Sequence, residues 1–343
     1  MDTTGLDDFL ADTEFSGVVL VRRENATVFE AATGLATQRW GIRNTLDTRF
    51  DTASITKLFT SVAVLQLVGA GRLDLERSIH DYVTLDGTTI PHDVTLLHLL
   101  THTSGIADIA EESVGEDADT GEDYAALWAR IPAYTLTETA DFLPLFAHKR
   151  PATMPGVEAA YSDAGYILAG LAVENATGMP YRQYVYDEVF TRAGMTDAGF
   201  YDRRDAAPRL AEGWDQGADG LWRANLFGAP PIGSPAEGAQ ATAADLARFA
   251  QALRAGELLN PELTGEFFIP QVQLDDETSY GFGLEFDLNR NGTTHSWYSD
   301  GIGAGASGIL RHYVDPGLDV VVLSNSEEGA WPVVRELDER LGG

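Results

Sequence analysis

The sequence of 343 residues contains no cysteine, which excludes disulfide bonds and thiolate metal ligands. Lysine is nearly absent as well, since Lys57 and Lys149 are the only two and arginine supplies the remaining Lys/Arg positions. No apolar run approaches the ~18 residues that a membrane-spanning helix needs. The first residues carry neither a basic stretch nor a long apolar segment. We therefore expect no secretory signal, no membrane partner and a cytoplasmic location.

Positive charge is scarce: 23 Lys and Arg stand against 53 Asp and Glu, giving a formal net charge of -30. Phosphate binding needs a basic face, so this balance argues against a nucleic-acid partner. The acidic residues are spread along the chain and form no tail. Such a surface is either simply well solvated or adapted to high salt, where screening removes most of the self-repulsion.

Apolar patterns predict strands near both ends of the chain and helices between them. This order predicts an α+β fold in which both termini build one sheet flanked by helices. We expect a single domain, 1–343, with one lobe from about 1–75 and 236–343 and an inserted helical lobe at about 76–235. The expected strands are 17–21, 26–32, 279–286, 306–314 and 318–324. The expected helices are 5–13, 54–68, 164–177 and 331–341.

The most informative motif is Ser54-Ile55-Thr56-Lys57, at the start of the expected helix 54–68. A serine hydroxyl is a poor nucleophile near neutral pH and needs an adjacent base. A lysine three residues later lies on the same helix face and can supply one. One such tetrapeptide is common by chance, but the scarcity of lysine makes this coincidence informative.

Tyr161 is the candidate for handling the leaving-group proton. It follows a Pro-Gly turn and precedes an apolar helix, which places it in a loop. Beside the Lys57 ammonium its pKa could fall, so that the phenolate becomes usable as a base. The alternative is a packing tyrosine with a hydrogen-bonded hydroxyl.

Six segments, in order along most of the chain, resemble the serine β-lactamase and penicillin-binding-protein superfamily. The resemblance is strongest to its class C β-lactamase-like branch, which also holds D,D-peptidases, D-amino-acid amidases and esterases. It implies an antiparallel sheet flanked by helices, a helical lobe, and a cleft between them. The matching segments are 50–57, 99–106, 155–166, 242–249, 280–284 and 321–325.

The resemblance also implies roles for individual residues. Ser54 becomes the acylated nucleophile, and Lys57 and Tyr161 become the general base and acid. The backbone N–H of Ser54 would be one oxyanion donor. Aligned on its glycine, the third family motif falls on Ser299-Asp300-Gly301, with the second donor on Ile302. No cofactor is implied.

The second family motif departs from its usual form, because Asp163 stands where asparagine is normal. An asparagine can donate to a substrate carbonyl, whereas an ionised aspartate only accepts. We expect that Asp163 instead pairs with Lys57 and keeps it charged, which would push Tyr161 toward the role of base.

The third motif has lost its cation, because Ser299 stands where lysine or histidine is usual. Asp300 beside it would repel a substrate carboxylate by about 4 kcal/mol at ~4 Å and an effective dielectric near 20. Carboxylate-bearing substrates are therefore disfavoured, unless His295 or Arg311 folds back into the site.

These arguments predict a serine hydrolase that works through a covalent acyl-enzyme, with small-molecule substrates. Carboxylesterase activity on small neutral esters is favoured. A β-lactamase or a D-amino-acid peptidase or amidase is the enzymatic alternative. A catalytically weak binding module on the same fold is the alternative of another class.

Other features are open to more than one interpretation. His98 and His102 are spaced four residues apart, with His92 nearby, but no His-Glu-x-x-His pattern accompanies them, so we expect no metal site. The acidic segment 108–123 is either a solvated insertion or a lid over the cleft. Five aromatic residues are candidates for an acyl pocket, although core packing is the default. They are Trp214, Trp222, Phe227, Trp297 and Tyr298.

Overall fold

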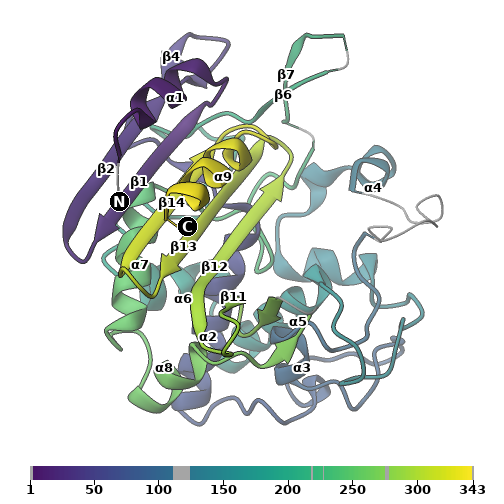
Figure 1. The fold of residues 1–343 in the computed structure, drawn as a ribbon. Coiled ribbons are helices and arrows are strands. Elements are labelled where there is room, and N and C mark those ends of the chain that lie inside the picture. Colours follow the sequence, from purple (N-terminus) through teal and green to yellow (C-terminus); the bar gives the residue numbers. More distant parts are fainter. Residues whose placement is uncertain (1–2, 111–123, 218, 227, 275–277, 342–343) are drawn as a thin grey trace.

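The computed structural model describes residues 3–110, 124–217, 219–226, 228–274 and 278–341 (Figure 1). Its largest sheet has eight strands in the order β2-β1-β14-β13-β12-β11-β10-β9, and each strand is antiparallel to its neighbours. The two N-terminal strands lie beside the last strand of the chain, which confirms the predicted α+β fold. The strands are β1 (Gly17–Arg23), β2 (Ala26–Thr33), β9 (Val272–Gln273), β10 (Thr278–Tyr280), β11 (Glu285–Leu288), β12 (Thr294–Gly303), β13 (Ala306–Tyr313) and β14 (Leu318–Ser324).

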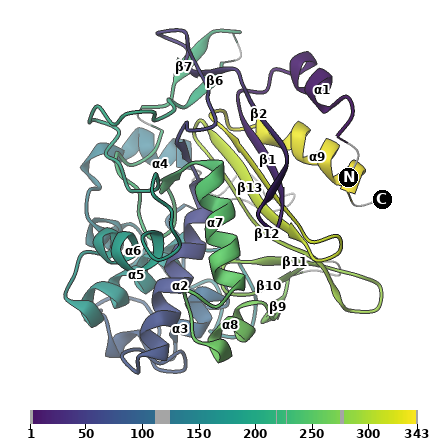
Figure 2. The same ribbon diagram turned by 90° about the vertical axis from the view of Figure 1, so that its left-hand side faces the viewer.

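Helices cover both faces of this sheet (Figure 2). Successive side chains of a strand point to opposite faces, and β1 shows this directly. Val19 and Val21 pack in a cluster with α1 (Leu6–Asp12) and α9 (Ala330–Leu341). Val18 and Leu20 pack in the larger cluster on the other side, which contains α2 (Thr56–Gly69), α5 (Asp163–Thr177) and α7 (Ala243–Arg254).

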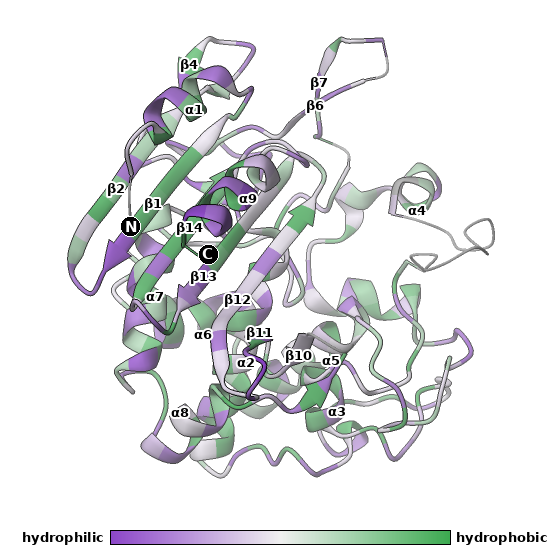
Figure 3. Ribbon diagram, viewed as in Figure 1, coloured by the Kyte–Doolittle hydropathy of each residue, from purple (hydrophilic) through white to green (hydrophobic). Residues whose placement is uncertain are grey.

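The two central helices of the larger cluster differ from the surface helices. α2 and α5 contact each other and are buried almost all round, as is typical of helices in the interior of a protein. By contrast, the surface helix α9 shows both hydrophilic and hydrophobic residues (Figure 3). The strand β1 is hydrophobic over most of its length in the same view. No helix in the described part of the chain is both long and apolar enough to cross a bilayer.

Shorter elements complete the fold around α2 and α5. The remaining helical segments are η1 (Ala53–Ile55), η2 (Ile79–Asp81), α3 (Leu96–Leu100), α4 (Tyr124–Arg130), η3 (Ala133–Thr135), η4 (Thr139–Leu145), α6 (Tyr181–Val185), the π-helical η5 (Tyr186–Phe190) and α8 (Pro261–Phe267). The remaining strands are β3 (Leu35–Thr37), β4 (Ile42–Arg43), β5 (Phe50–Asp51), β6 (Trp214–Gln216), β7 (Trp222–Ala224) and β8 (Gln240–Ala241).

One expected strand is wrong. The segment 279–286 forms two antiparallel strands, β10 and β11, joined by a tight turn. Gly283 has φ +83°, a value that glycine adopts without strain, and the N–H of Gly281 donates to the carbonyl of Leu284 at 2.8 Å. The turn also packs against α2, since a Cβ on Gly283 would lie 3.3 Å from the Leu58 amide nitrogen. The two glycines thus break a segment that reads as one continuous strand.

Candidate active site

Ser54 lies in the turn η1, immediately before α2. Ala53 in this turn has φ +43°, which is strained for a residue with a Cβ. Neighbouring groups hold the turn in place: the Asp51 carboxylate accepts the N–H of Ala53 at 2.8 Å, and the N–H of Thr52 donates to the carbonyl of Ala239 at 2.8 Å. Strained backbone of this kind persists only where its surroundings fix it. Ser54 is thereby held in one orientation, partly exposed to solvent.

The structure brings together the three side chains predicted to be catalytic. The Tyr161 hydroxyl lies 2.7 Å from Ser54 Oγ, and Lys57 Nζ lies 3.1 Å from the same atom. Lys57 Nζ also donates to the carbonyl of Ala236 at 2.9 Å and pairs with Asp163 Oδ1 at 2.6 Å. These oxygens, together with the Tyr161 side chain, surround the ammonium group.

The pairing expected between Asp163 and Lys57 is therefore present, and it determines the charge of the lysine. Burial alone would lower the pKa of Lys57, which is 2% exposed. The negative charge of Asp163, together with Tyr161, outweighs burial and raises the pKa above its ordinary value. Lys57 is an ammonium at neutral pH, so it acts first as a hydrogen-bond donor to Ser54.

The expectation of a lowered pKa for Tyr161 is wrong. Burial of the hydroxyl raises its pKa most, the Lys57 ammonium lowers it in part, and Asp163 raises it again, so that the net shift is upward. Tyr161 as a whole residue is 51% exposed. The sequence indicated the attractive partner, but it could not show that an aspartate would offset the lysine. Tyr161 is a neutral phenol in the resting site.

Asp163 is in turn held by two residues that were not singled out as site residues. The Tyr124 hydroxyl donates to its carboxylate. Asp108 accepts the N–H groups of Asp163 at 3.1 Å and of Ala164 at 2.8 Å, at the start of α5. Burial and the nearby Asp163 raise the pKa of Asp108 to about 6. Asp108 therefore anchors the helix start and is not simply solvated; the segment 111–123, where a lid was considered, lies outside the described residues.

His102 positions the loop that carries Tyr161. Its imidazole Nδ1 accepts the N–H of Ser162 at 3.1 Å, and its ring lies 4.5 Å from the Tyr161 ring, between centroids. Burial, and then the Lys57 charge, hold the pKa of His102 well below its ordinary value. A neutral imidazole can accept this hydrogen bond, whereas an imidazolium could not. Among residues with described positions, no three His, Asp or Glu side chains are grouped to hold a metal ion.

The third motif approaches the nucleophile through its glycine. A Cβ on Gly301 would lie 2.6 Å from the carbonyl oxygen of Thr52 and 2.8 Å from the amide nitrogen of Ser54. Only glycine permits this approach of strand β12 to η1. By strand alternation Ser299 shares this face, and it is 5% exposed. The described part of β11 pairs with β12 only as far as Tyr298, which leaves one edge of 299–303 open toward the site.

The side chains of Asp300 and Ile302 leave β12 on the opposite face. Neither of the two cations considered, Arg311 and His295, folds back to replace the missing lysine. Arg311 lies over the Tyr298 ring, 4.4 Å from its centroid, and pairs with Asp338 at 2.7 Å. The His295 ring packs against Tyr313 at 5.8 Å. The lack of a cation at Ser299 is thus a firmer argument against carboxylate substrates than the charge of Asp300.

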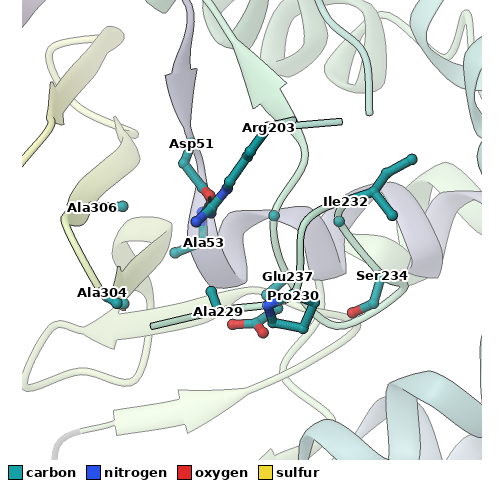
Figure 4. A pocket seen from close by; sticks show the side chains of 13 residues that line it. Asp51, Ala53, Arg203, Ala229, Pro230, Ile232, Ser234, Glu237, Ala304 and Ala306 are labelled. Atoms are coloured by element: carbon teal, nitrogen blue, oxygen red, sulfur yellow. Dashed lines mark hydrogen bonds and ion pairs between the residues drawn. The ribbon is translucent and has the colours of Figure 1, made fainter. Parts of the chain in front are cut away.

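A small cavity, partly open to solvent, lies beside the Ser54 turn (Figure 4). Ala53, Gly303 and Ala304 line one part of it, and Glu237 lines another. Burial most strongly, then Asp163 and Asp51, raise the pKa of Glu237 to about 7. Nothing in the sequence indicated Glu237, because its position depends on how the loop before β8 folds back.

The four described aromatic residues considered for an acyl pocket do not line this cavity. Trp297 is buried in the larger core cluster and Trp214 is buried in β6. Trp222 is 43% exposed, and Tyr298 donates to Glu285 at 2.9 Å. Phe227 lies outside the described residues.

Comparison with known proteins identifies the family to which the chain belongs. A family model described as beta-lactamase matches residues 6–341. The chain belongs to this β-lactamase family. The match spans the sheet and the helical region, and it confirms the resemblance that the six sequence segments carry.

Relatives within the β-lactamase family include proteins named for binding penicillin and for hydrolysing esters. The putative penicillin-binding protein PbpX of Bacillus subtilis is 28% identical over 95% of this chain and 74% of its own. Esterase EstB of Burkholderia gladioli is 32% identical over 53% of this chain and 46% of its own. The crystal structure of a penicillin-binding protein from Bacillus halodurans has 34% identity and a TM-score of 0.91, covering 98% of this chain and 100% of that one.

Proposed function

We propose that this member of the β-lactamase family hydrolyses small neutral esters through a covalent acyl-enzyme on Ser54. The observation that supports this most is the position of Ser54 Oγ, 2.7 Å from the Tyr161 hydroxyl and 3.1 Å from Lys57 Nζ. A nucleophile within hydrogen-bond reach of two proton-carrying groups is the arrangement that acyl transfer needs.

The charges of the site assign the order of proton movements. In the resting site Ser54 Oγ accepts hydrogen bonds from both the Lys57 ammonium and the Tyr161 hydroxyl. The Tyr161–Lys57 pair must first release one proton to solvent, after which Tyr161 can accept the proton of Ser54. Ser54 Oγ then attacks the ester carbonyl, and Tyr161 passes the proton to the departing alcohol.

The developing oxyanion needs donors that are already in place. The backbone N–H groups of Ser54 and Ile302 are the candidates, since Gly301 brings β12 against the Ser54 turn. In the second half of the reaction, water attacks the acyl carbon and gives a proton to Tyr161. Ser54 Oγ leaves as the hydroxyl, and the carboxylic acid is released.

Two features favour neutral esters over β-lactams and peptides with a free C-terminus, both of which bear a carboxylate. Ser299 supplies no cation, and Lys57 already donates to Ser54 and Ala236 and forms an ion pair with Asp163. A penicillin-binding or D,D-peptidase activity is the second candidate, because the relative that covers nearly the whole chain at 34% identity is a penicillin-binding protein. The contacts of Ser54 argue against a binding module without catalysis.

Turnover of a short-chain nitrophenyl ester and of a chromogenic cephalosporin separates these candidates. We expect a higher kcat/KM for the ester, and a loss of at least ~10³-fold in Ser54→Ala. Preferential turnover of the cephalosporin would instead establish a β-lactamase. Turnover of neither compound would favour the binding module.

A further inference from the structure

We propose that the cavity beside Ser54 is an acyl pocket in which the carboxylate of Glu237 binds an ammonium group on the acyl half of the substrate. The inference rests on the proposed ester hydrolysis and replaces the neutral acyl half by that of a small amino acid, in which the carbonyl carbon and the ammonium lie two bonds apart.

Two residues of the cavity lining are chain neighbours of groups that take part in the proposed reaction. Ala53, which precedes the nucleophile, and Gly303, which follows the expected oxyanion donor Ile302, both line it. The loop that carries Glu237 also contacts two residues close to Ser54. The carbonyl of Ala236 accepts from Lys57 at 2.9 Å, and the N–H of Gly238 donates to the carbonyl of Ala53 at 3.4 Å. An acyl group attached to Ser54 can therefore enter this cavity.

The charges of the cavity leave one carboxylate without a partner. Asp51 and Arg203, which both line it, form an ion pair with each other. Glu237, also in the lining, has no hydrogen bond or ion pair to its carboxylate from any described residue. Figure 4 shows this carboxylate beside Pro230 and apart from the Asp51–Arg203 pair. When Glu237 is ionised, the side-chain charges of the lining therefore sum to one negative charge, placed where a cationic group would be paired.

The electrostatics of Glu237 agree with this reading. Burial and two neighbouring aspartates hold its pKa near 7, so the free pocket ionises reluctantly. A bound ammonium would favour the ionised carboxylate and form a charge-assisted hydrogen bond with it. An anionic acyl group would be repelled.

The walls of the cavity indicate the size of the acyl group. Most of the lining residues are glycine or alanine, contributed by η1, the turn between β12 and β13, and the loop before β8. Because they project little into the space, they leave room for a short side chain. Alanyl is therefore a suitable probe, with isobutyryl as its uncharged isostere and methylmalonyl as the form with a carboxylate.

The test compares 4-nitrobenzyl esters of these three acyl groups at pH 7, using both enantiomers of alanine and chromatographic detection. We expect wild type to prefer one alanyl enantiomer over isobutyryl in kcat/KM and to disfavour methylmalonyl. Glu237→Gln should reduce the alanyl-to-isobutyryl ratio by about tenfold or more, mainly through KM, the size expected for a hydrogen bond to a charged group. Turnover of the isobutyryl ester should stay within about threefold of wild type, which shows that the variant is folded.

Glu285→Gln is the matched control. The pKa of Glu285 is likewise raised to about 7, by burial and then Asp300, but its carboxylate accepts from Tyr298 and does not line the cavity. This variant should leave the ratio unchanged. An unchanged ratio in Glu237→Gln, or an equal fall for both esters, would overturn the proposal.

Binding provides a measurement that does not depend on turnover. Calorimetric titration of Ser54→Ala with alaninamide and isobutyramide should show tighter binding of alaninamide, and the preference should disappear in Ser54→Ala/Glu237→Gln. A preference there with no ester turnover in wild type would contradict only the proposed function. Equal binding of both amides by Ser54→Ala would contradict the ammonium pocket itself.

Discussion

Asp163 sets the charge of the groups around Ser54. Its carboxylate pairs with Lys57 at 2.6 Å and accepts from Tyr124. Adding to the effect of burial, its charge also raises the pKa of Tyr161 and of Glu237. A single residue that differs from the asparagine expected at this position therefore favours the protonated forms of several groups at once. In the proposed mechanism, proton release from the Tyr161–Lys57 pair then limits formation of the base.

Replacing Asp163 by asparagine should move the rising limb of the pH–rate profile to lower pH. Removal of the negative charge lowers the pKa of Lys57 and Tyr161, so that the pair releases its proton at a lower pH. We expect a displacement on the order of one pH unit or more, given the short distance and the burial of the pair. The measurement is kcat/KM for a neutral nitrophenyl ester as a function of pH.

Asp300→Asn is the control for this displacement. Asp300 begins on the other face of β12, and its carboxylate is influenced chiefly by burial and Arg311, and only weakly by Lys57. Its replacement removes one negative charge near the site without breaking the ion pair of Lys57, and it should move the limb much less. A limb that stays in place, or moves to higher pH, in Asp163→Asn would contradict the charge assignment.

At the scale of elements, the site depends on how closely β12 approaches the turn η1. Gly301 permits this approach, because a side chain there would meet backbone atoms of Thr52 and Ser54, which cannot rotate away. Gly303 lies two residues further along the same strand, and a Cβ there would meet only Ala53 Cβ at 3.8 Å, an ordinary contact.

The two glycines give a matched pair of variants. Gly301→Ala should separate β12 from Ser54 and lower kcat by about 100-fold, the effect of losing one oxyanion donor. Gly303→Ala should retain most of kcat, since it leaves the approach of β12 unchanged, and any effect of its added methyl group on the proposed acyl pocket should appear in KM. Circular dichroism checks that both variants fold. Equal activity of the two variants would show that β12 does not supply the oxyanion donor.

Much of this arrangement of elements could be predicted from the sequence. The strands β13 and β14 and the helices α5 and α9 have strong apolar patterns, and the motif segments placed Ser54, Lys57 and Tyr161 close together. The hairpin of β10 and β11 was missed because the apolar pattern of this segment continues on both sides of Gly281 and Gly283, the two glycines that form the turn.

Other parts of the site could not be predicted, because they depend on contacts between distant segments. Asp108 caps a helix that begins 55 residues later, and Glu237 reaches the cavity through a loop of no regular structure. The direction of the pKa shift of Tyr161 required the balance of burial, Lys57 and Asp163. Local sequence patterns carry no information on such balances.

At the scale of the whole molecule, the net charge of -30 is the dominant feature. Neither lysine is free on the surface to pair with the acidic side chains. Lys57 is buried, and Lys149 donates to the carbonyls of Asp108 and Ile109 at 2.8 and 2.9 Å. Self-repulsion of such a surface opposes folding, and salt screens it. Screening lengths fall from about 10 Å at 0.1 M to about 3 Å at 1 M salt.

Thermal unfolding should therefore depend strongly on salt. We expect the unfolding midpoint to rise by about 5 °C or more between 0.1 M and 2 M KCl, which corresponds to a gain on the order of 2 kcal/mol. Sucrose, which stabilises by exclusion from the surface without screening, serves as the control for nonspecific effects. A midpoint that is already maximal in dilute buffer would contradict adaptation to salt.

We propose above all that Ser54 becomes acylated with the help of Lys57 and Tyr161. Labelling with a fluorophosphonate probe, followed by mass spectrometry of the intact protein and its peptides, tests this claim most directly. We expect one adduct per chain on Ser54 and no adduct in Ser54→Ala. Labelling should be strongly slowed in Lys57→Ala and Tyr161→Phe. The absence of an adduct on the wild-type protein, or an equal adduct on Ser54→Ala, would contradict it.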